Sequence, residues 1–313
     1  MENIIEVERL TKRFGMFEAV KGIDFQVKRG SLFALLGTNG AGKSTTIEIL
    51  CTLQEKTSGK VLMNGQLLGT AKSNERIRKA IGVVFQQSLL DEQLTVRENI
   101  WHRGMFYRLT KKQLIENYEF VRESLKLGEI ENVKYGRLSG GQKRRADIAR
   151  AIIHKPEILF LDEPTTGLDP KTRKFVWQVI DQLRKEKNMT VFLTTHYMEE
   201  AALADDIAIM KEGKIIARGS PQFLKEKYAK DQLILLLKDG GEERLKELSI
   251  PYKKRAEAYV IPVKSTLEAL PILEKVKDDI SSFEVIKGTL DDIFLEVNGG
   301  GDQDVCQLSA AQL

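Results

Sequence analysis

Two glycine-rich stretches of this chain combine residue types that could hold phosphate groups. The first, GTNGAGKST at 37–45, follows the apolar run SLFALL and precedes the helix-like TTIEILCTL. Glycines let backbone N–H groups turn inward onto phosphate oxygens, and a helix that begins there offers the positive end of its dipole. Lys43 would then bridge the β- and γ-phosphates of a nucleotide, and the Ser44 hydroxyl would bind Mg²⁺. The alternative is a strand-to-helix turn that needs glycine only for its backbone angles.

The stretch 37–45 matches the Walker A pattern GxxxxGK[ST] at each required position, and it stands between a strand and a helix as that pattern requires. The full match argues against a plain turn. We therefore expect one loop to surround the phosphates, made of Gly37, Thr38, Asn39, Gly40, Ala41, Gly42, Lys43, Ser44 and Thr45.

A second run, ILFLDEP at 158–164, ends in two neighbouring carboxylates. Neighbouring residues of a strand point to opposite faces, so Asp162 and Glu163 cannot share one role. Beside a Walker A loop the pair fits a Walker B site, in which Asp162 holds Mg²⁺ through water and Glu163 faces the water that attacks the γ-phosphate. The alternative is an acidic pair at a strand end that is only solvated.

The second glycine-rich stretch, LSGGQKRRADIARA at 138–151, opens a charged helical pattern. Ser139 and Gln142 have the spacing of a capping box, which by itself predicts only a helix start. A serine hydroxyl and glycine N–H groups at a helix N-terminus also form an anion site. One nucleotide does not need two such sites, so the second one requires its own explanation. The basic run KRR at 143–145 is typical of a solvated helix surface rather than of nucleic-acid binding.

Three continuous apolar runs resemble buried parallel strands: SLFALLG at 31–37, EILFLDEP at 157–164 and TVFLTTH at 190–196. Continuous rather than alternating hydrophobicity is expected where helices cover both faces of a sheet. Ligands gather at the carboxyl ends of such strands. The alternating runs IIEVERLTKRF and GIDFQVKRG favour antiparallel strands beside this sheet. The sequence thus predicts an α/β fold.

The patterns along the chain predict three parts. Capping boxes at Thr95–Glu98 and Thr110–Gln113 begin amphipathic helices, so residues from about 88 to 150 form a helical insertion in a first domain that spans 1–225. Strand-like and helix-like runs then alternate in a small α+β domain at 231–298. The glycine-rich and polar end, 299–313, is expected to be a disordered tail.

The composition narrows the classes of function. Basic and acidic residues nearly balance, 49 against 45, so no strong positive field argues for a nucleic-acid partner. Two cysteines are too few for a disulfide or zinc framework and fit a reducing compartment. The charged N-terminus resembles no signal peptide, and no apolar run approaches the ~18 residues of a membrane span. We expect a cytoplasmic chain that is soluble by itself and needs a partner for any membrane role.

With these motifs in place, the chain resembles the ATP-binding cassette (ABC) ATPases. LSGGQ resembles the signature motif of that family, and other family elements surround it in order across residues 5 to about 220. Phe14 of TKRFG stands where the family has an aromatic residue that stacks on adenine, although an aromatic could instead belong to the core. Gln86 of VVFQQ matches the loop glutamine that senses Mg²⁺ and contacts the transporter. His196 of TTH matches the switch histidine at the γ-phosphate.

The resemblance implies a P-loop NTPase cassette with a RecA-like core, an antiparallel β-subdomain and a helical subdomain. It implies ATP and Mg²⁺ as cofactors, with catalysis by Glu163, His196 and Gln86. Mg²⁺ would be bound by Ser44, Gln86 and Asp162. In the family, the signature residues contact ATP held by another subunit, which would explain the second anion site in a head-to-tail homodimer, or in a heterodimer with a related cassette. The residues that would reach that ATP are Ser139, Gly140, Gly141, Gln142 and Asp169 of LDEPTTGLDP.

Two stretches resemble one branch of the family. RRADIARA after the signature and GTLDDIFLEV at 288–297 are similar to the daunorubicin-resistance type of ATPase subunit. Subunits of this type power separate permeases of ABC-2 exporters, which move drugs, lipids, polysaccharides or ions. The resemblance therefore implies a subunit that lies on the inner face of the cell membrane and docks to its permease near Gln86 and the helical insertion. It names no cargo.

Two other hypotheses stay open. A non-transport ABC ATPase that acts on nucleic acid or ribosomes would typically carry two cassettes or a long coiled coil, and the near-neutral charge counts against it. The small domain at 231–298 could act as a regulatory or dimer-stabilising module, because its sequence has no metal cluster and no further glycine-rich loop.

Overall fold

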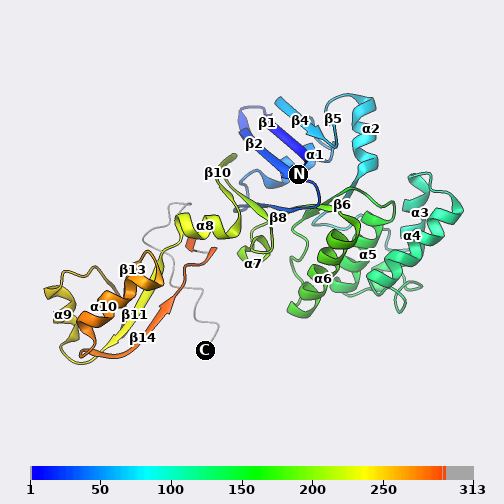
Figure 1. Ribbon diagram of the computed structural model, residues 1–313. Helices are drawn as coiled ribbons and strands as arrows, with labels where there is room; N and C mark the ends of the chain where they lie inside the picture. Colours follow the sequence, from blue (N-terminus) through cyan, green and yellow to red (C-terminus); the bar gives the residue numbers. More distant parts are fainter. Residues whose placement is uncertain (1, 291, 294–313) are drawn as a thin grey trace. The chain divides into compact units, whose positions relative to one another are not determined.

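The chain packs into two compact units, one ending at Arg218 and the other beginning at Gly219 (Figure 1). The computed structural model describes residues 2–290 and 292–293. The expected tail at 299–313 and the last residues of the stretch at 288–297 lie outside the described residues. The predicted first domain, 1–225, ends later than this boundary, because the second unit includes the helix that follows Gly219.

The core of the first unit is a six-stranded sheet with the order β10-β9-β3-β8-β7-β6. The pairs β3–β8, β3–β9, β6–β7 and β7–β8 are all parallel. The three apolar runs predicted to be buried strands are β3, β7 and β8, and every residue in them is buried, which confirms that both faces of the sheet are covered. The strands are β3 (Leu32–Leu36), β6 (Ile81–Val84), β7 (Ile158–Asp162), β8 (Thr190–Thr195), β9 (Asp206–Lys211) and β10 (Lys214–Gly219).

An antiparallel sheet with the order β2-β1-β4-β5 lies beside this core. Phe25 of β2 stacks on Phe33 of β3 at a ring distance of 5.3 Å, and Phe33 contacts Phe192 of β8 at 5.2 Å, so aromatic packing joins the two sheets. The predicted antiparallel pair is confirmed, although β2 begins earlier than the alternating pattern indicated. The strands are β1 (Asn3–Phe14), β2 (Phe17–Lys28), β4 (Ser58–Met63) and β5 (Gln66–Leu67).

The helices of the first unit begin where the sequence offers caps. Capping boxes at Thr95, Thr110 and Ser139 are present, each closed by the residue three positions later, which confirms these predictions. Helices α3, α4 and α5 pack against one another and form the helical insertion (Figure 1). The helices are α1 (Lys43–Leu50), α2 (Ala71–Ala80), α3 (Val96–Phe106), α4 (Lys111–Ser124), the 3-10 turn η1 (Tyr135–Arg137), α5 (Gly140–Ile152), α6 (Pro170–Lys187) and α7 (Met198–Ala201).

The second unit is an antiparallel sheet with the order β12-β13-β11-β14, and it has its own apolar core around Leu233, Leu235 and Ile261. The expected α+β pattern is present, together with β12, whose sequence KKR has no apolar alternation that could predict it. Among the described residues, no helix of either unit combines the length and the hydropathy that crossing a bilayer requires. The elements are α8 (Pro221–Tyr228), β11 (Asp231–Leu237), α9 (Gly241–Glu247), β12 (Lys253–Arg255), β13 (Ala258–Val263), the 3-10 turn η2 (Thr266–Glu268), α10 (Ala269–Val276) and β14 (Ile280–Ile286).

Candidate functional site

The glycine-rich loop joins the end of β3 to the start of α1, as its sequence predicts. Gly42 has a φ of +105°, and a Cβ at this position would lie 2.5 Å from the carbonyl oxygen of Ala19. At Gly37 a Cβ would lie 2.4 Å from the carbonyl oxygen of Met210. Both positions therefore require glycine, because neighbouring backbone fills the space where a side chain would begin.

Lys43, the first residue of α1, is buried and folds back over its own loop. Its Nζ donates hydrogen bonds to the carbonyl oxygens of Gly37 at 2.8 Å and Thr38 at 3.0 Å. The same Nζ lies 3.9 Å from Oε1 of Glu163. Burial lowers the pKa of Lys43, while the carboxylates of Glu163 and Asp162 oppose that shift. The loop thus holds one positive charge that faces two acids.

Asp162 ends strand β7 and is buried beside β8. The Thr194 hydroxyl donates a hydrogen bond to Oδ1 of Asp162. Burial raises the pKa of Asp162, and the Thr194 hydrogen bond opposes this. Glu163 does not continue the strand, because its φ is +44°, in the left-handed region. The two carboxylates are therefore separated by a backbone turn after β7, and the prediction that strand alternation separates them was wrong.

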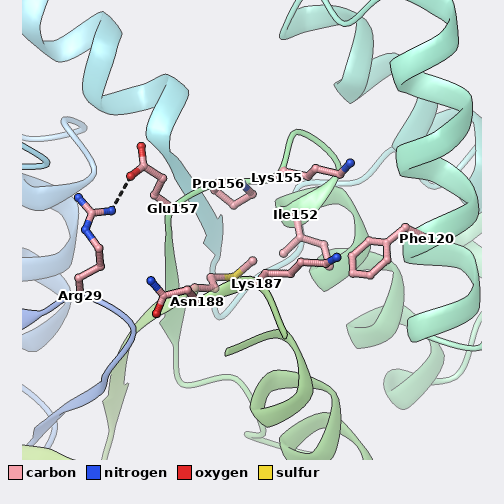
Figure 2. Close-up of a pocket in the computed structure, with 9 residues that line it drawn as sticks. Arg29, Phe120, Ile152, Lys155, Pro156, Glu157, Lys187 and Asn188 are labelled. Atoms are coloured by element: carbon pink, nitrogen blue, oxygen red, sulfur yellow. Dashed lines mark hydrogen bonds and ion pairs between the residues drawn. The ribbon is translucent and has the colours of Figure 1, made fainter. Parts of the chain in front are cut away.

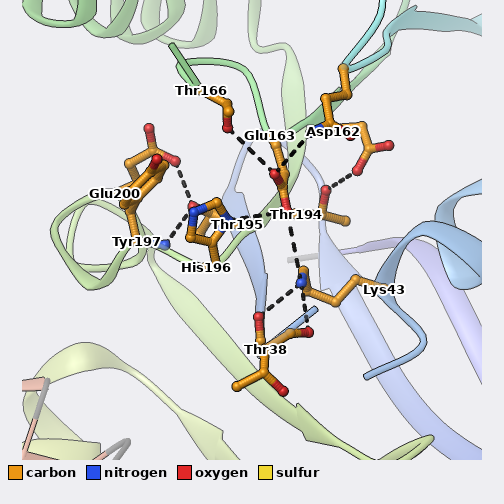
Figure 3. Close-up of polar contacts among 12 residues, drawn as sticks. Thr38, Lys43, Asp162, Glu163, Thr166, Thr194, Thr195, His196, Tyr197 and Glu200 are labelled. Carbon is orange, nitrogen blue, oxygen red and sulfur yellow. Dashed lines mark hydrogen bonds and ion pairs between the residues drawn. The ribbon is translucent and has the colours of Figure 1, made fainter. Parts of the chain in front are cut away.

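Side chains from separate parts of the chain lie around the Glu163 carboxylate (Figure 3). Nδ1 of His196, just after β8, lies 3.1 Å from Oε1 of Glu163, off the axis of a hydrogen bond. Gln86, just after β6, donates its amide to Oε2 at 3.5 Å, and the Thr166 hydroxyl donates to the same oxygen at 3.4 Å. With Lys43, this gathers the residues to which the resemblance gives catalytic roles around one carboxylate.

Glu200 of α7 positions this cluster, although it was not among the predicted site residues. It is 1% exposed and accepts hydrogen bonds from the hydroxyls of Thr165 and of Thr195, the latter at 2.6 Å (Figure 3). The backbone N–H of Tyr197 donates to the Thr195 hydroxyl at 3.0 Å. These bonds tie the turn after Glu163 to the segment that carries His196. Its one sequence signal, a carboxylate four residues after a histidine, is too common to single it out.

A cavity of about 420 Å³ lies over the loop, within the usual size range of ligand pockets. Phe17 and Ala19 of β2 line it and were not predicted, whereas Phe14 is not among the lining residues. Phe14 is 46% exposed, which excludes the core alternative, and Nζ of Lys12 lies 4.7 Å from its ring centre. The residues that line the cavity are Phe17, Ala19, Asn39, Gly40, Gly42, Lys43, Ser44, Thr45, Gln86 and Glu163.

The oxygen and amide groups at this cavity fit a hard divalent cation that keeps water and substrate oxygens as ligands. Ser44 and Gln86 line the cavity, and Asp162 lies beside Lys43 and Glu163. Within the described ranges 2–290 and 292–293, no cluster of three or more His, Cys, Asp or Glu residues could hold a metal by itself. A few oxygen ligands completed by phosphates and water are what Mg²⁺ prefers.

The second glycine-rich stretch forms the exposed tip of α5. The N–H of Ser139 donates to Oε1 of Gln142 at 3.0 Å, and the N–H of Gln142 donates to the Ser139 hydroxyl at 3.4 Å. None of the residues 139–142 lines the cavity over the chain's own glycine-rich loop. The tip therefore offers an anion site away from the one that Lys43 serves.

Asp169 caps the neighbouring helix α6. Its carboxylate accepts hydrogen bonds from the N–H of Thr172 at 3.0 Å and from the Thr172 hydroxyl at 2.5 Å. The bonds from Thr172 lower the pKa of Asp169. A Cβ on Gly141 would lie 2.6 Å from Cγ2 of Thr172, so the start of α5 packs directly on the start of α6.

Arg144 of α5 is a further residue at the site that was not predicted. It is 6% exposed and donates to the carbonyl oxygens of Phe85 at 2.6 Å, Glu163 at 3.2 Å and Pro164. The prediction that the basic run 143–145 is solvated surface was wrong at this position. The helical period could have indicated it, because Arg144 lies on the same face of α5 as the buried residues Asp147 and Ile148.

A second cavity, of about 340 Å³, lies at the other end of β7 and β8 (Figure 2). This cavity lies at the C-terminal ends of α5 and α6. Helix C-termini present carbonyl oxygens rather than N–H groups, so the cavity does not favour phosphate binding. Arg29 at its edge is paired with Glu157 at 2.6 Å. None of the predicted site residues lines it, and the lining residues are Arg29, Phe120, Ile152, Lys155, Pro156, Glu157, Lys187, Asn188 and Met189.

Comparisons with known proteins agree with this geometry. The family model described as ABC transporter matches residues 20–166. The chain is 34% identical to the daunorubicin/doxorubicin resistance ATP-binding protein DrrA of Streptomyces peucetius, over 98% of this chain and 96% of that protein. It is 41% identical to the probable multidrug ABC transporter ATP-binding protein YbhF of Escherichia coli (strain K12) over 74% of this chain, but spans only 39% of that protein's length.

Among solved structures, the dimeric bacterial ABC transporter cassette MJ0796 superposes with a TM-score of 0.64 at 29% identity, covering 69% of this chain and 98% of that one. This confirms the predicted P-loop cassette fold. Sequence similarity that extends over nearly the whole of DrrA and of this chain leads to the same family. The chain belongs to the ABC transporter family of ATP-binding proteins.

Proposed function

We propose that this chain binds and hydrolyses Mg-ATP and thereby powers a separate membrane permease. The observation that carries the proposal is the Glu163 carboxylate at the cavity over the glycine-rich loop, with Lys43 at 3.9 Å, His196 at 3.1 Å and Gln86 at 3.5 Å. A carboxylate in that place can accept a proton from water, and a buried lysine can neutralise phosphate charge. Phe14, at the end of β1, would stack on the adenine base.

In the proposed reaction, water attacks the γ-phosphorus of ATP, the bond to the β-γ bridging oxygen breaks, and ADP leaves. Glu163 takes the proton of the attacking water. Lys43 moves from its carbonyl partners onto the β- and γ-phosphate oxygens, and His196 orients the γ-phosphate beside Glu163. Bound Mg²⁺, held by Ser44, Gln86 and Asp162, would supply neutralisation of the charge on the β- and γ-phosphate oxygens.

The tip of α5 gives the reason to propose a dimer. Each chain has one glycine-rich loop and one serine-capped helix tip that does not line its own cavity, so two copies placed head-to-tail would complete two sites. Ser139, Gly140, Gly141 and Gln142 would contact the ATP of the other subunit, with Asp169 at the same interface. The solved MJ0796 cassette is dimeric, which supports this arrangement. The second copy could be identical or a related cassette.

The names of the relatives support export as the process that is powered. DrrA is named for resistance to daunorubicin and doxorubicin, and YbhF as part of a probable multidrug transporter. We propose that this chain likewise serves an exporter, bound to its permease on the cytoplasmic face of the membrane. Gln86 and the helical insertion would be the parts that contact the permease.

Substituting Glu163 tests the proposed chemistry. Glu163→Gln keeps the size and the hydrogen-bonding shape of the side chain but cannot take a proton, so steady-state ATP hydrolysis should fall by about 100-fold or more. ATP binding, measured by fluorescence of a nucleotide analogue, should persist. The matched control is Glu157→Gln, a carboxylate just before the other end of the same strand, which should retain hydrolysis. Full turnover by the Glu163 variant would remove the proposed base.

A further inference from the structure

Helix α5 carries three charged side chains along one buried face. Arg144, Asp147 and Arg150 follow one another at intervals of three residues, which places them on the same side of a helix. They are 6%, 6% and 7% exposed, which is unusual for charged residues. Burying a charge is costly unless it is paired or hydrogen-bonded, so these side chains require an explanation.

All three side chains bond to one short stretch, residues 83–88, here called the Gln86 segment. The guanidinium of Arg150 donates to the carbonyl oxygen of Val83 at 2.7 Å, and that of Arg144 donates to the carbonyl oxygen of Phe85 at 2.6 Å. The hydroxyl of Ser88 donates to Oδ1 of Asp147 at 2.6 Å. The bonds lie on both sides of Gln86 and leave its amide directed at Glu163.

Arg144 also connects this face of the helix to the reacting centre. Besides Phe85 it donates to the carbonyl oxygens of Glu163 at 3.2 Å and of Pro164, in the turn that sets the Glu163 backbone. One helix therefore holds the Gln86 segment and the Glu163 turn, and the same helix begins with the exposed tip at Ser139.

We propose that Arg144, Asp147 and Arg150 are positioning residues that fix the Gln86 segment to α5, so that Gln86 and the Ser139 tip move as one body. The inference rests on the proposed function, because it links the chain's own ATP to the tip that serves its partner's ATP. A shift of Gln86 on ATP binding or on permease contact would then shift the tip as well. If these side chains only stabilised the fold, Gln86 and the tip would respond separately.

Ser88 gives the sharpest test, because it is exposed and its hydroxyl joins the segment to Asp147. The same hydroxyl also accepts the N–H of Leu90 at 3.1 Å, within the loop that follows. We expect Ser88→Ala to lower kcat for ATP by about 10-fold, since small misplacements of catalytic groups are costly, with KM changed by less than about 3-fold. Ser88→Thr keeps the hydroxyl and has room for the methyl group in solvent, so it should recover most of the activity. Asp147→Ala removes the acceptor of the Ser88–Asp147 bond and should act in the same direction.

The matched control is Glu131→Gln. Asp147 accepts the Tyr135 hydroxyl at 3.3 Å, and Glu131 likewise accepts the Tyr118 hydroxyl at 2.8 Å. The hydrogen bonds of the Glu131 side chain go to Tyr118 and Arg122, and none goes to the Gln86 segment. Its substitution should leave kcat unchanged. The double variant Ser88→Ala/Asp147→Ala should be little slower than Asp147→Ala alone, because both changes remove the Ser88–Asp147 bond. Equal losses in the Glu131 control, or fully additive losses in the double variant, would overturn the proposal.

Amide hydrogen exchange gives a readout that does not depend on hydrolysis. Exchange at residues 83–90 should quicken in the Ser88→Ala and Asp147→Ala variants and stay unchanged in the Glu131 control. Unchanged exchange there would refute the positioning role even if the wild-type protein proved inactive. Absence of Glu163-dependent hydrolysis in the wild-type protein would instead refute the proposed function, so the two failures can be told apart.

Discussion

At the scale of single residues, the site contains charged side chains in buried positions, where an uncharged side chain would favour folding. Asp162 is buried, and the same burial raises its pKa while lowering that of Lys43. Opposed pKa shifts of this kind mark an acid and a base that are close together and poorly solvated. Groups with such pKa shifts cluster at functional sites. The consequence is that removing a charge here should strengthen the free protein while it weakens the chemistry.

The variant Asp162→Asn tests whether removing one buried charge stabilises the free protein. The folded-state pKa of Asp162 lies above its unfolded value, so stability falls as the pH rises through the interval between them, and the loss persists at neutral pH. Asparagine cannot ionise and still accepts the Thr194 hydroxyl, so we expect the variant to unfold at a higher temperature, by roughly 2–4 °C for each kcal/mol gained.

Calorimetry without nucleotide measures this difference, which should narrow as the pH is lowered toward the ordinary carboxyl pKa. Asp181 provides the opposite case, because its hydrogen bond to Lys185 lowers its pKa. Asp181→Asn should therefore leave the unfolding temperature unchanged or lower it slightly. A lower unfolding temperature for Asp162→Asn at neutral pH would contradict the argument.

At the scale of elements, the two glycines at the start of α5 face different constraints. A Cβ on Gly141 would meet Cγ2 of Thr172 at 2.6 Å, whereas a Cβ on Gly140 would meet nothing within 4 Å. Gly141 thus permits α5 and α6 to begin against each other. Gly140 lies on the open side of the tip, where the proposed function places the partner's nucleotide.

Alanine substitutions at Gly140 and Gly141 distinguish a glycine needed for helix packing from one that faces the proposed nucleotide. Gly141→Ala should destabilise the fold by about 1–3 kcal/mol through overpacking, and Thr172→Ala added to it should restore part of the loss. Gly140→Ala should leave stability within about 1 kcal/mol of wild type, on the favourable side, because alanine is the better helix former. Denaturant unfolding measures all three. Equal costs at both glycines would show that contact with Thr172 is not what fixes Gly141.

The elements also show which features a sequence can reveal. Strands β3, β7 and β8 and the caps of α3, α4 and α5 could be predicted, because hydrophobic periodicity and cap chemistry are local. The left-handed turn at Glu163 and the two threonine partners of Glu200 could not, because they depend on contacts between residues far apart in the chain. The same holds for Arg144, whose burial depends on carbonyl groups from two other segments.

At the scale of the whole molecule, the cassette holds one cavity over the glycine-rich loop and one helix tip that does not line it. The relation between the two can be tested by mixing defective chains. Lys43→Ala should disable the loop and leave the tip intact, and Ser139→Arg should do the reverse. Each variant alone should be inactive in ATP hydrolysis if a site needs both parts.

Equal amounts of the two variants, expressed together, should recover about a quarter of wild-type hydrolysis if chains pair at random, because half of the dimers then contain one intact site. Hydrolysis measured against the mixing ratio should peak at equality. No recovery at any ratio would contradict reciprocal completion of the sites.

The backbone at Glu163 has a consequence for how such proteins diverge. A φ of +44° strains any residue with a side chain, and glycine alone adopts it freely. A mutation from glutamate to glycine at this position would therefore remove the carboxylate that we propose as the base without straining the main chain. The backbone therefore does not require glutamate at this position, and a copy of the chain with glycine there should still fold while it lacks the proposed base.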